Sequence, residues 1–102
     1  MVKVMLWIDD ERATPKFPMS FLTITARDYP SAIEVLGFCR DKGWDVYIDL
    51  DHDLGEGKTG YDICKFIVEN QIPLIGYHLH TMNPVGRQNM EQLLSHYGYN
   101  PF

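Results

Sequence analysis

The chain has 102 residues, of which 45% are hydrophobic and 23% charged, a composition typical of one globular domain spanning residues 1–102. Its formal net charge of −5 argues against a surface that follows the phosphates of duplex DNA, because such surfaces are basic. No apolar stretch is long enough to span a bilayer, no export signal opens the chain, and the two cysteines are isolated. These features predict a cytoplasmic protein that does not enter membranes.

Strands and helices are predicted to alternate along the chain. Apolar or β-branched segments predict strands over residues 2–8, 21–26, 44–50 and 73–80. Helical spacing of apolar residues predicts helices over residues 28–42, 61–70 and 84–97. Pro15 and Pro18 block a regular helix between the first two strands, so an extended loop is expected there. This alternation predicts an α/β fold with a parallel sheet and helices on both faces.

Acidic and histidine side chains follow three of the predicted strands, at the point where each strand ends. They lie in residues 7–11, 48–54 and 77–84. Neighbouring strands of a parallel sheet lie about 4.8 Å apart, and their carboxyl ends open onto one crevice. The sequence therefore predicts that carboxylates and imidazoles gather at one edge of the sheet.

Several of these residues resemble the receiver domain of two-component signalling. The resemblance rests on the paired acids Asp9 and Asp10, on Asp51 after the third strand, and on residues 60–62 at the start of the next helix. It implies that the paired acids bind a metal, that Asp51 matches the phosphoacceptor, and that Thr81 matches the switch hydroxyl. Departures from the pattern argue against aspartyl-phosphate signalling. The first and last receiver helices are missing, and Asn100 stands at the position of the receiver's lysine.

A closer resemblance covers nearly the whole chain. Residues 6–12, 51–55, 59–62 and 80–87 are similar to receiver-derived domains that process cyclic phosphates. This implies a flavodoxin/receiver-like, three-layer parallel sheet in the order 2-1-3-4 that lacks the first and last receiver helices. It also implies a phosphoesterase, linked to RNA repair, with histidines added to the acidic pocket. His52 and His80 match that pattern, whereas His78 is an additional histidine.

The chemistry of ring opening indicates roles for these histidines. Opening a cyclic phosphodiester requires a water molecule to lose a proton while the leaving oxygen gains one. Two imidazoles can do both near neutral pH, because their pKa lies at about 6.5. His52 and His80 are therefore predicted to be the acid–base pair, with Asp51 as a third catalytic residue. The predicted phosphate contacts are Thr81, Asn83, Arg87 and Arg12.

The clustered carboxylates also predict a metal site. A divalent ion would offset their repulsion of an anionic substrate. The predicted ligands are Asp9, Asp10, Asp51 and Asp53. Oxygen ligands favour Mg²⁺ or Ca²⁺, and the spacing of the histidines matches no zinc motif.

Less specific interpretations apply to other polar residues. Asp49 is expected to point to a sheet face or a buried partner, His78 to be a hydrogen-bonded core residue, and His96 to lie on the surface. No stacking platform with adjacent basic residues is visible in the sequence.

The leading hypothesis is a cyclic phosphodiesterase or phosphoesterase, a hydrolase that acts on a small phosphorylated or cyclic-phosphate substrate, a nucleotide or an RNA end. The alternative is a non-enzymatic receiver-like module that binds a metal or a phosphorylated ligand and a protein partner. A third hypothesis is a degenerate scaffold domain. The added histidines favour the enzyme, whereas the missing lysine disfavours conventional signalling.

Overall fold

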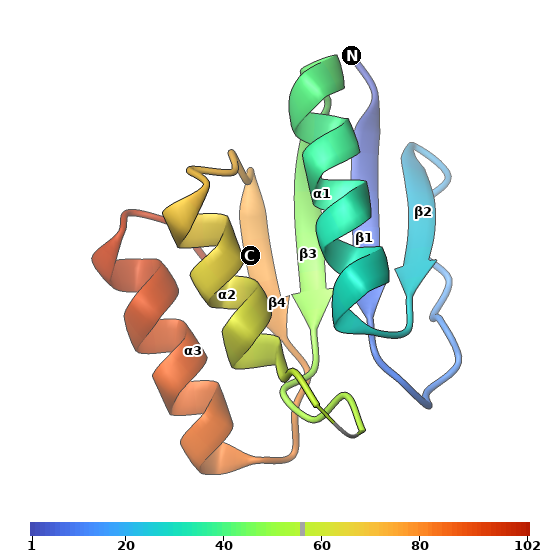
Figure 1. Ribbon diagram of the computed structural model, residues 1–102. Coiled ribbons are helices and arrows are strands. Elements are labelled where there is room, and N and C mark those ends of the chain that lie inside the picture. The colour runs from blue at the N-terminus through green and yellow to red at the C-terminus, as the bar shows by residue number, and fades with distance from the viewer. Residues whose placement is uncertain (56) are drawn as a thin grey trace.

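The computed structural model describes residues 1–55 and 57–102. Its elements, in chain order, are β1 (Lys3–Ile8), β2 (Phe21–Ala26), α1 (Tyr29–Lys42), β3 (Asp45–Leu50), α2 (Gly60–Glu69), β4 (Gly76–Leu79) and α3 (Pro84–His96). All four strands are parallel, in the order β2-β1-β3-β4 (Figure 1). The predicted strand order and the predicted alternation of elements are confirmed. Only β4 is clearly shorter than the strand expected over residues 73–80.

The three helices all cover the same face of the sheet, as Figure 1 shows. The sheet and helices thus form two layers, which corrects the expectation of three layers with helices on both faces. The connections that carry α1 and α2 run in one direction across the sheet, from β2 to β3 to β4. Right-handed crossovers in one direction place their helices on one face. The reverse step, from β1 to β2, carries no helix.

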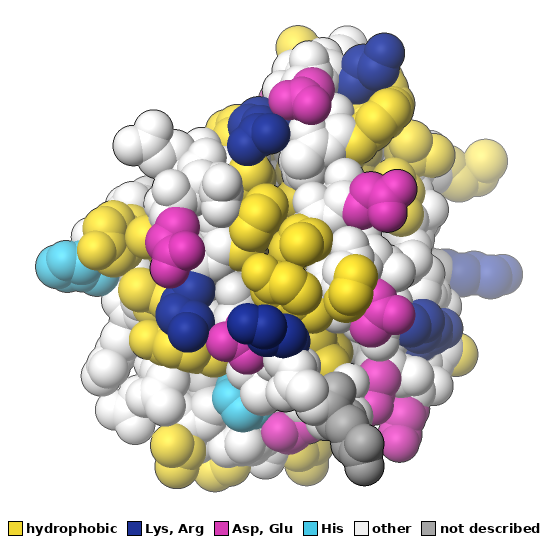
Figure 2. All heavy atoms as spheres, in the orientation of Figure 1, with side chains coloured by type: hydrophobic (Ala, Val, Ile, Leu, Met, Phe, Trp, Pro, Cys, Tyr) yellow, Lys and Arg dark blue, Asp and Glu magenta, His cyan; other side chains and the backbone are white. Residues whose placement is uncertain are grey.

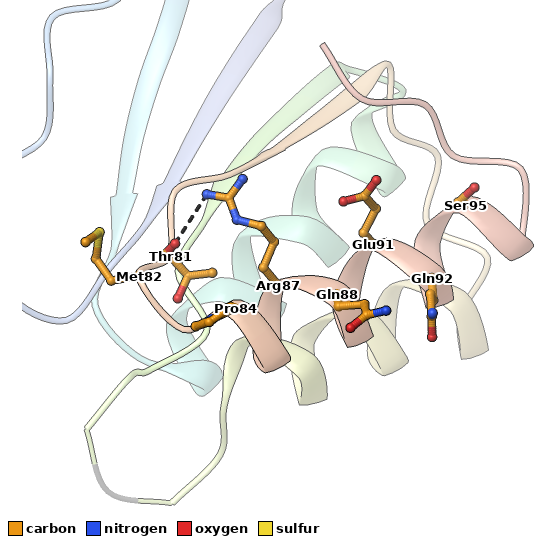
Figure 3. Close-up of a pocket in the computed structure, with 8 residues that line it drawn as sticks. All are labelled: Thr81, Met82, Pro84, Arg87, Gln88, Glu91, Gln92 and Ser95. Atoms are coloured by element: carbon orange, nitrogen blue, oxygen red, sulfur yellow. Dashed lines mark hydrogen bonds between the residues drawn. The ribbon is translucent and has the colours of Figure 1, made fainter.

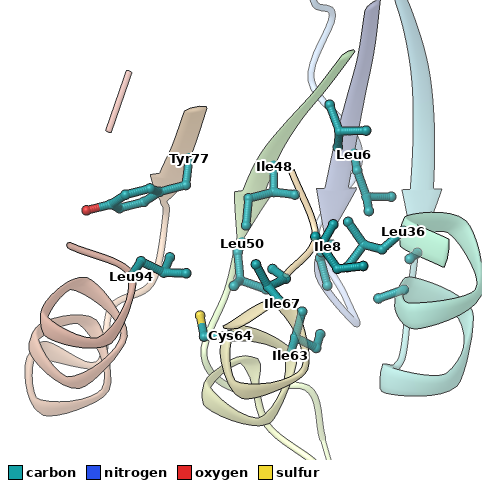
Figure 4. Close-up of a cluster of buried hydrophobic side chains, with 14 of the residues drawn as sticks. Leu6, Ile8, Leu36, Ile48, Leu50, Ile63, Cys64, Ile67, Tyr77 and Leu94 are labelled. Carbon is teal, nitrogen blue, oxygen red and sulfur yellow. The ribbon is translucent and has the colours of Figure 1, made fainter. Parts of the chain in front are cut away.

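Alternate residues of the two central strands face the helices and form the core. In β1 these are Val4, Leu6 and Ile8, and in β3 they are Val46, Ile48 and Leu50, all buried. Side chains from the three helices pack against them, as Figure 4 shows for Leu36, Ile63, Ile67 and Leu94. Burial of this apolar surface is the main stabilising contribution to the fold.

Aromatic side chains cover the other face of the sheet in place of helices. Met5 and Trp7 of β1 point to that face and are nevertheless buried. Phe17, from the loop before β2, lies with its ring centroid 6.2 Å from that of Trp7. Tyr47 of β3 makes edge-to-face contacts with Phe21 at 5.2 Å and with Phe102 at 5.3 Å. Aromatic pairs of this geometry add stabilisation beyond the area they bury.

The C-terminal residues extend the sheet beyond β4. The N–H of Tyr77 donates to the carbonyl of Asn100 at 3.1 Å, and the N–H of Phe102 donates to the carbonyl of Tyr77 at 2.9 Å. Asn100 therefore lies beside Tyr77 within β4 and not at the strand tips. The sequence-based match of Asn100 to the position of the receiver lysine is thereby corrected.

The helix-bearing surface is shown in Figure 2, where hydrophobic side chains form a strip along the seam between α1 and α2, with charged side chains on both sides. None of the helices in the described residues combines the length and the apolar character needed to cross a membrane.

Candidate active site at the carboxyl ends of the strands

A pocket of about 350 Å³ lies at the carboxyl ends of β1 and β3. We call it the acidic pocket; its lining residues are Asp9, Asp10, Glu11, Arg12, Asp51, Asp53, Gly55 and Met82. Because β1 and β3 pair with Ile8 opposite Leu50, the residues that follow them emerge side by side. Gly55 has a φ of 79° and a Cβ there would lie 3.3 Å from the Asp10 carboxylate, so glycine both allows the turn and leaves room for Asp10.

Asp9 is the most deeply buried acid of the pocket, with 1% of its surface exposed. Its Oδ1 accepts hydrogen bonds from the N–H groups of Glu11 and Arg12, both at 2.8 Å, and its Oδ2 lies 2.9 Å from His80 Nε2. Burial opposes ionisation of this carboxyl. The two backbone N–H groups and His80 outweigh burial, so the pKa of Asp9 lies below its ordinary value.

His80 is held between two carboxylates. Its Nδ1 lies 2.6 Å from Asp49 Oδ1, and its Nε2 lies 2.9 Å from Asp9 Oδ2. The ring stacks on Trp7 with centroids 3.9 Å apart and planes 4° apart. Burial lowers the pKa of this imidazole, but the hydrogen bonds to Asp49 and Asp9 outweigh burial and raise the pKa above its ordinary value. An ionised carboxylate only accepts hydrogen bonds, so a ring that donates to both carboxylates carries a proton on each nitrogen.

Asp49 extends this hydrogen-bonded chain toward the helix-free face of the sheet. Its Oδ1 also lies 3.0 Å from Nδ1 of His78. Asp49 is expected to meet a sheet face or a buried partner, and in the structure its partners are His78 and His80. His78 is hydrogen-bonded as expected, but its side chain is half exposed, so the expectation of a core residue is wrong.

Asp49 is a residue of the site that the sequence prediction left out. The alternation of Asp49 with Asp51, and of His78 with His80, on paired strands was the signal.

Asp9, Asp51 and His80 form a cluster that could hold a metal ion. One ligand atom from each residue lies within 4.8 Å of the other two. Two carboxylates and one imidazole are an established kind of donor set for divalent cations. Asp10 and Asp53, the other predicted ligands, line the same acidic pocket.

His52 lies outside the acidic pocket. Its ring packs against Gly86 in the first turn of α3, and its side chain is 18% exposed. Its Nδ1 lies 3.0 Å from Asp53 Oδ1 and 3.4 Å from the amide nitrogen of Asn83. The ring of His52 therefore reaches the pocket through Asp53, and its backbone N–H donates to Asp51 Oδ1 at 2.8 Å. Residues 51–53 follow the end of β3, and the ring of His52 turns toward α3 whereas Asp51 and Asp53 line the pocket.

The predicted phosphate contacts are divided between two places. Arg12 lines the acidic pocket and donates from Nη1 to the carbonyl of His80 at 2.8 Å. Asn83 caps α3, where its Oδ1 accepts from the N–H of Gly86. Thr81 and Arg87 line a second, larger pocket along α3, drawn in Figure 3. The structure thus brings only Arg12 to the acids.

Arg27 is a further residue that the sequence prediction missed. Its Nη1 donates to the carbonyl of Asp9 at 3.0 Å and to that of Arg12 at 2.6 Å. It therefore fixes the loop that follows β1. A single arginine after β2 belongs to no sequence motif. Its role in fixing the loop after β1 becomes visible only from its hydrogen bonds across the edge of the sheet.

The parallel sheet in the order 2-1-3-4, with acids at the ends of its two central strands, defines a receiver-like domain. The family whose model matches is described as the cyclic-phosphate processing receiver domain, and the match covers residues 4–96. The chain belongs to this family. Comparisons with curated proteins and with solved structures gave no match.

Proposed function

We propose that the acidic pocket hydrolyses a cyclic phosphate carried by a nucleotide or an RNA end. The observation that carries the proposal is the cluster of Asp9, Asp51 and His80, in which three ligand atoms lie within 4.8 Å of one another. Together with the family's link to cyclic-phosphate processing, this cluster supports a site for a phosphoryl group at the strand tips.

The charge of the pocket requires a cation for this reaction. Five acidic side chains and one arginine line it, so a phosphate would be repelled without added positive charge. Asp9 and Asp51, with Asp10 and Asp53 nearby, would hold a divalent cation, which would polarise a phosphoryl oxygen. Carboxylate ligands favour Mg²⁺, Ca²⁺ or Mn²⁺, whereas participation of His80 as a ligand would favour Zn²⁺ or Mn²⁺.

The residues of the chain supply positioning and proton transfer. Arg12 has a half-exposed side chain and keeps guanidinium donors beyond its bond to His80, so it can bind a phosphoryl oxygen. Asp53 lines the pocket with its side chain 65% exposed, so its carboxylate can take a proton from the attacking water. His52 is hydrogen-bonded to Asp53 and would share the proton taken from water, which the pair would then deliver to the leaving oxygen. His80 supplies positive charge beside Asp9 in the metal-free pocket, and it would release a ring proton where it binds the ion as a ligand.

The experiment is an assay of the purified domain with 2′,3′- and 3′,5′-cyclic nucleotides, with EDTA or with added Mg²⁺, Mn²⁺, Ca²⁺ or Zn²⁺. We expect metal-dependent turnover of one class, lost in Asp51→Asn and retained in Asp41→Asn. Asp41 is the matched control because it is an exposed acid on α1. Absence of turnover with every ion would overturn the proposal. Loss of metal binding in His80→Gln, measured by calorimetry, would identify His80 as a ligand.

One observation favours the non-enzymatic alternative as the second candidate. Among the described residues, neither His52 nor His80 lines the acidic pocket, and both ring nitrogens of His80 face carboxylates, which disfavours the two-imidazole mechanism. A receiver-like module would bind a divalent ion and inorganic phosphate in calorimetry without turning over any cyclic nucleotide. That combination of results would replace the hydrolase with the binding module.

A further inference from the structure

The second pocket runs along the exposed side of α3 and has a volume of about 590 Å³. We call it the α3 groove; its lining is shown in Figure 3. Its polar side chains are Thr81, Arg87, Gln88, Glu91, Gln92 and Ser95, and its apolar ones are Met82 and Pro84. Small-molecule sites have volumes of roughly 300 to 1,000 Å³ and combine apolar surface with a few polar groups. The groove has both the size and the composition of such a site.

The groove differs from the acidic pocket in charge. The positive charge of Arg87 and the negative charge of Glu91 offset each other, and the remaining polar side chains of the groove are neutral. Gln88 and Gln92 lie one helical turn apart, so their amides project from the same side of α3. Each amide offers two donors and an acceptor. The groove therefore suits a neutral ligand with donors and acceptors along its edge better than it suits a second phosphate.

Met82 connects the two sites. It lines both the acidic pocket and the α3 groove, and 83% of its surface is exposed. Thr81, the residue before it, is buried and anchors the rim through the bond from Arg87 Nη2 to its carbonyl at 3.2 Å. A ligand with its charged end among the acids can thus extend over Met82 into the groove. A polarisable thioether also makes favourable contacts with aromatic rings.

We propose that the α3 groove binds the nucleobase of the molecule whose cyclic phosphate enters the acidic pocket, an inference that rests on the proposed function. A nucleobase is a flat, neutral heterocycle with hydrogen-bonding groups along its edge. Amides and guanidinium groups pair with such edges in proteins that bind nucleic acids. Gln88, Gln92 and Arg87 supply these groups, and Met82 and Pro84 supply apolar contact.

The first experiment uses nucleosides that carry no phosphate, so that neither metal nor catalysis is needed. Adenosine, guanosine, cytidine and uridine are titrated in turn into ¹⁵N-labelled protein. We expect at least one to shift the side-chain amide signals of Gln88 and Gln92. Gln88→Ala should weaken its binding severalfold, as expected for the loss of a hydrogen bond. Asn89→Ala is the matched control, because Asn89 is an exposed amide on α3 that does not line the groove. Absence of these shifts with all four nucleosides would overturn the inference.

The second experiment separates the inference from the proposed function. Turnover of a cyclic nucleotide is compared with turnover of glycerol 1,2-cyclic phosphate, which has no base. We expect a KM about tenfold lower for the nucleotide, and we expect the Gln88→Ala/Gln92→Ala variant to remove this difference, since two hydrogen bonds are lost. Equal KM values in the wild type would refute the base site and leave the hydrolase intact. Nucleoside binding without turnover of either compound would refute the hydrolase and leave the base site standing.

Discussion

The imidazole ring of His52 lies against the Cα atom of Gly86, so close that a Cβ at Gly86 would come within 2.5 Å of His52 Cγ. This contact joins the tip of β3 to the first turn of α3. It also explains why a helix contains glycine at a buried position, although glycine lowers helix propensity.

Gly86→Ala should therefore displace His52 and lower the free energy of unfolding by about 1 to 3 kcal/mol, the usual effect of overpacking. Chemical denaturation measures this loss. In a His52→Ala background the same change should cost little, because the ring is gone, and a double-mutant cycle would quantify the coupling. A Gly86→Ala variant as stable as the wild type would contradict the contact.

Gly60, the first residue of α2, allows a second close approach. A Cβ at this position would overlap the backbone oxygen of Asp51, and backbone atoms cannot move aside as a side chain can. We expect Gly60→Ala to be strongly destabilising and to shift the NMR signals of the acidic pocket. The control is Gly37→Ala in α1, where the nearest atom is Arg40 Nη2 at 4.0 Å. That change should stabilise the protein by up to about 1 kcal/mol. Equal effects of the two substitutions would refute this account.

His80 should make stability depend on pH in the metal-free protein. Its pKa is raised in the folded state, so its contribution is fully present below the unfolded pKa of about 6.5 and is lost as pH rises through the higher folded value. Urea denaturation in EDTA between about pH 5 and 9 should show this decline. His80→Gln should remove that part of the decline, whereas His96→Gln, an exposed substitution, should retain it. An unchanged pH dependence in His80→Gln would rule out the imidazolium.

Both cysteines should be unreactive in the native state. Burial raises the pKa of the Cys64 thiol to about 12 and also raises that of Cys39, so neither forms the reactive thiolate near neutral pH. A chromogenic disulfide reagent should label neither thiol in buffer and both in denaturant. Rapid labelling of the native protein would show that one of the helices bearing them opens readily.

The proximity of Asp9 to Asp51 could be predicted because parallel strands end at one edge, and the structure confirms it. The position of the His52 ring could not, because residues 51–53 lie in a loop after β3 whose side-chain directions no strand pattern determines. Asp49 lies beside His78 and His80, although the sequence alone predicts only a sheet face or a buried partner for it. Side-chain alternation on β3 and on its partner β4, taken together, predicts this placement of Asp49.

The face chosen by the helices depends on the direction in which the chain crosses the sheet. Strand and helix patterns alone do not contain this information, which requires the strand order and the rule for crossover handedness together. The role of Arg27 depends on the reach of a long side chain between loops, which no local pattern encodes.

The central position of β1 sets the order in which the site can assemble during synthesis. This strand is made before the other three, but its partner β3 is made only after β2 and α1. Asp9 meets His80 only after β4 has been made, so its imidazole partner is synthesised after the acids that follow β1 and β3. Such non-local pairing slows folding and leaves apolar strands exposed meanwhile. The nascent chain therefore carries the acids of the pocket long before it can hold them in place.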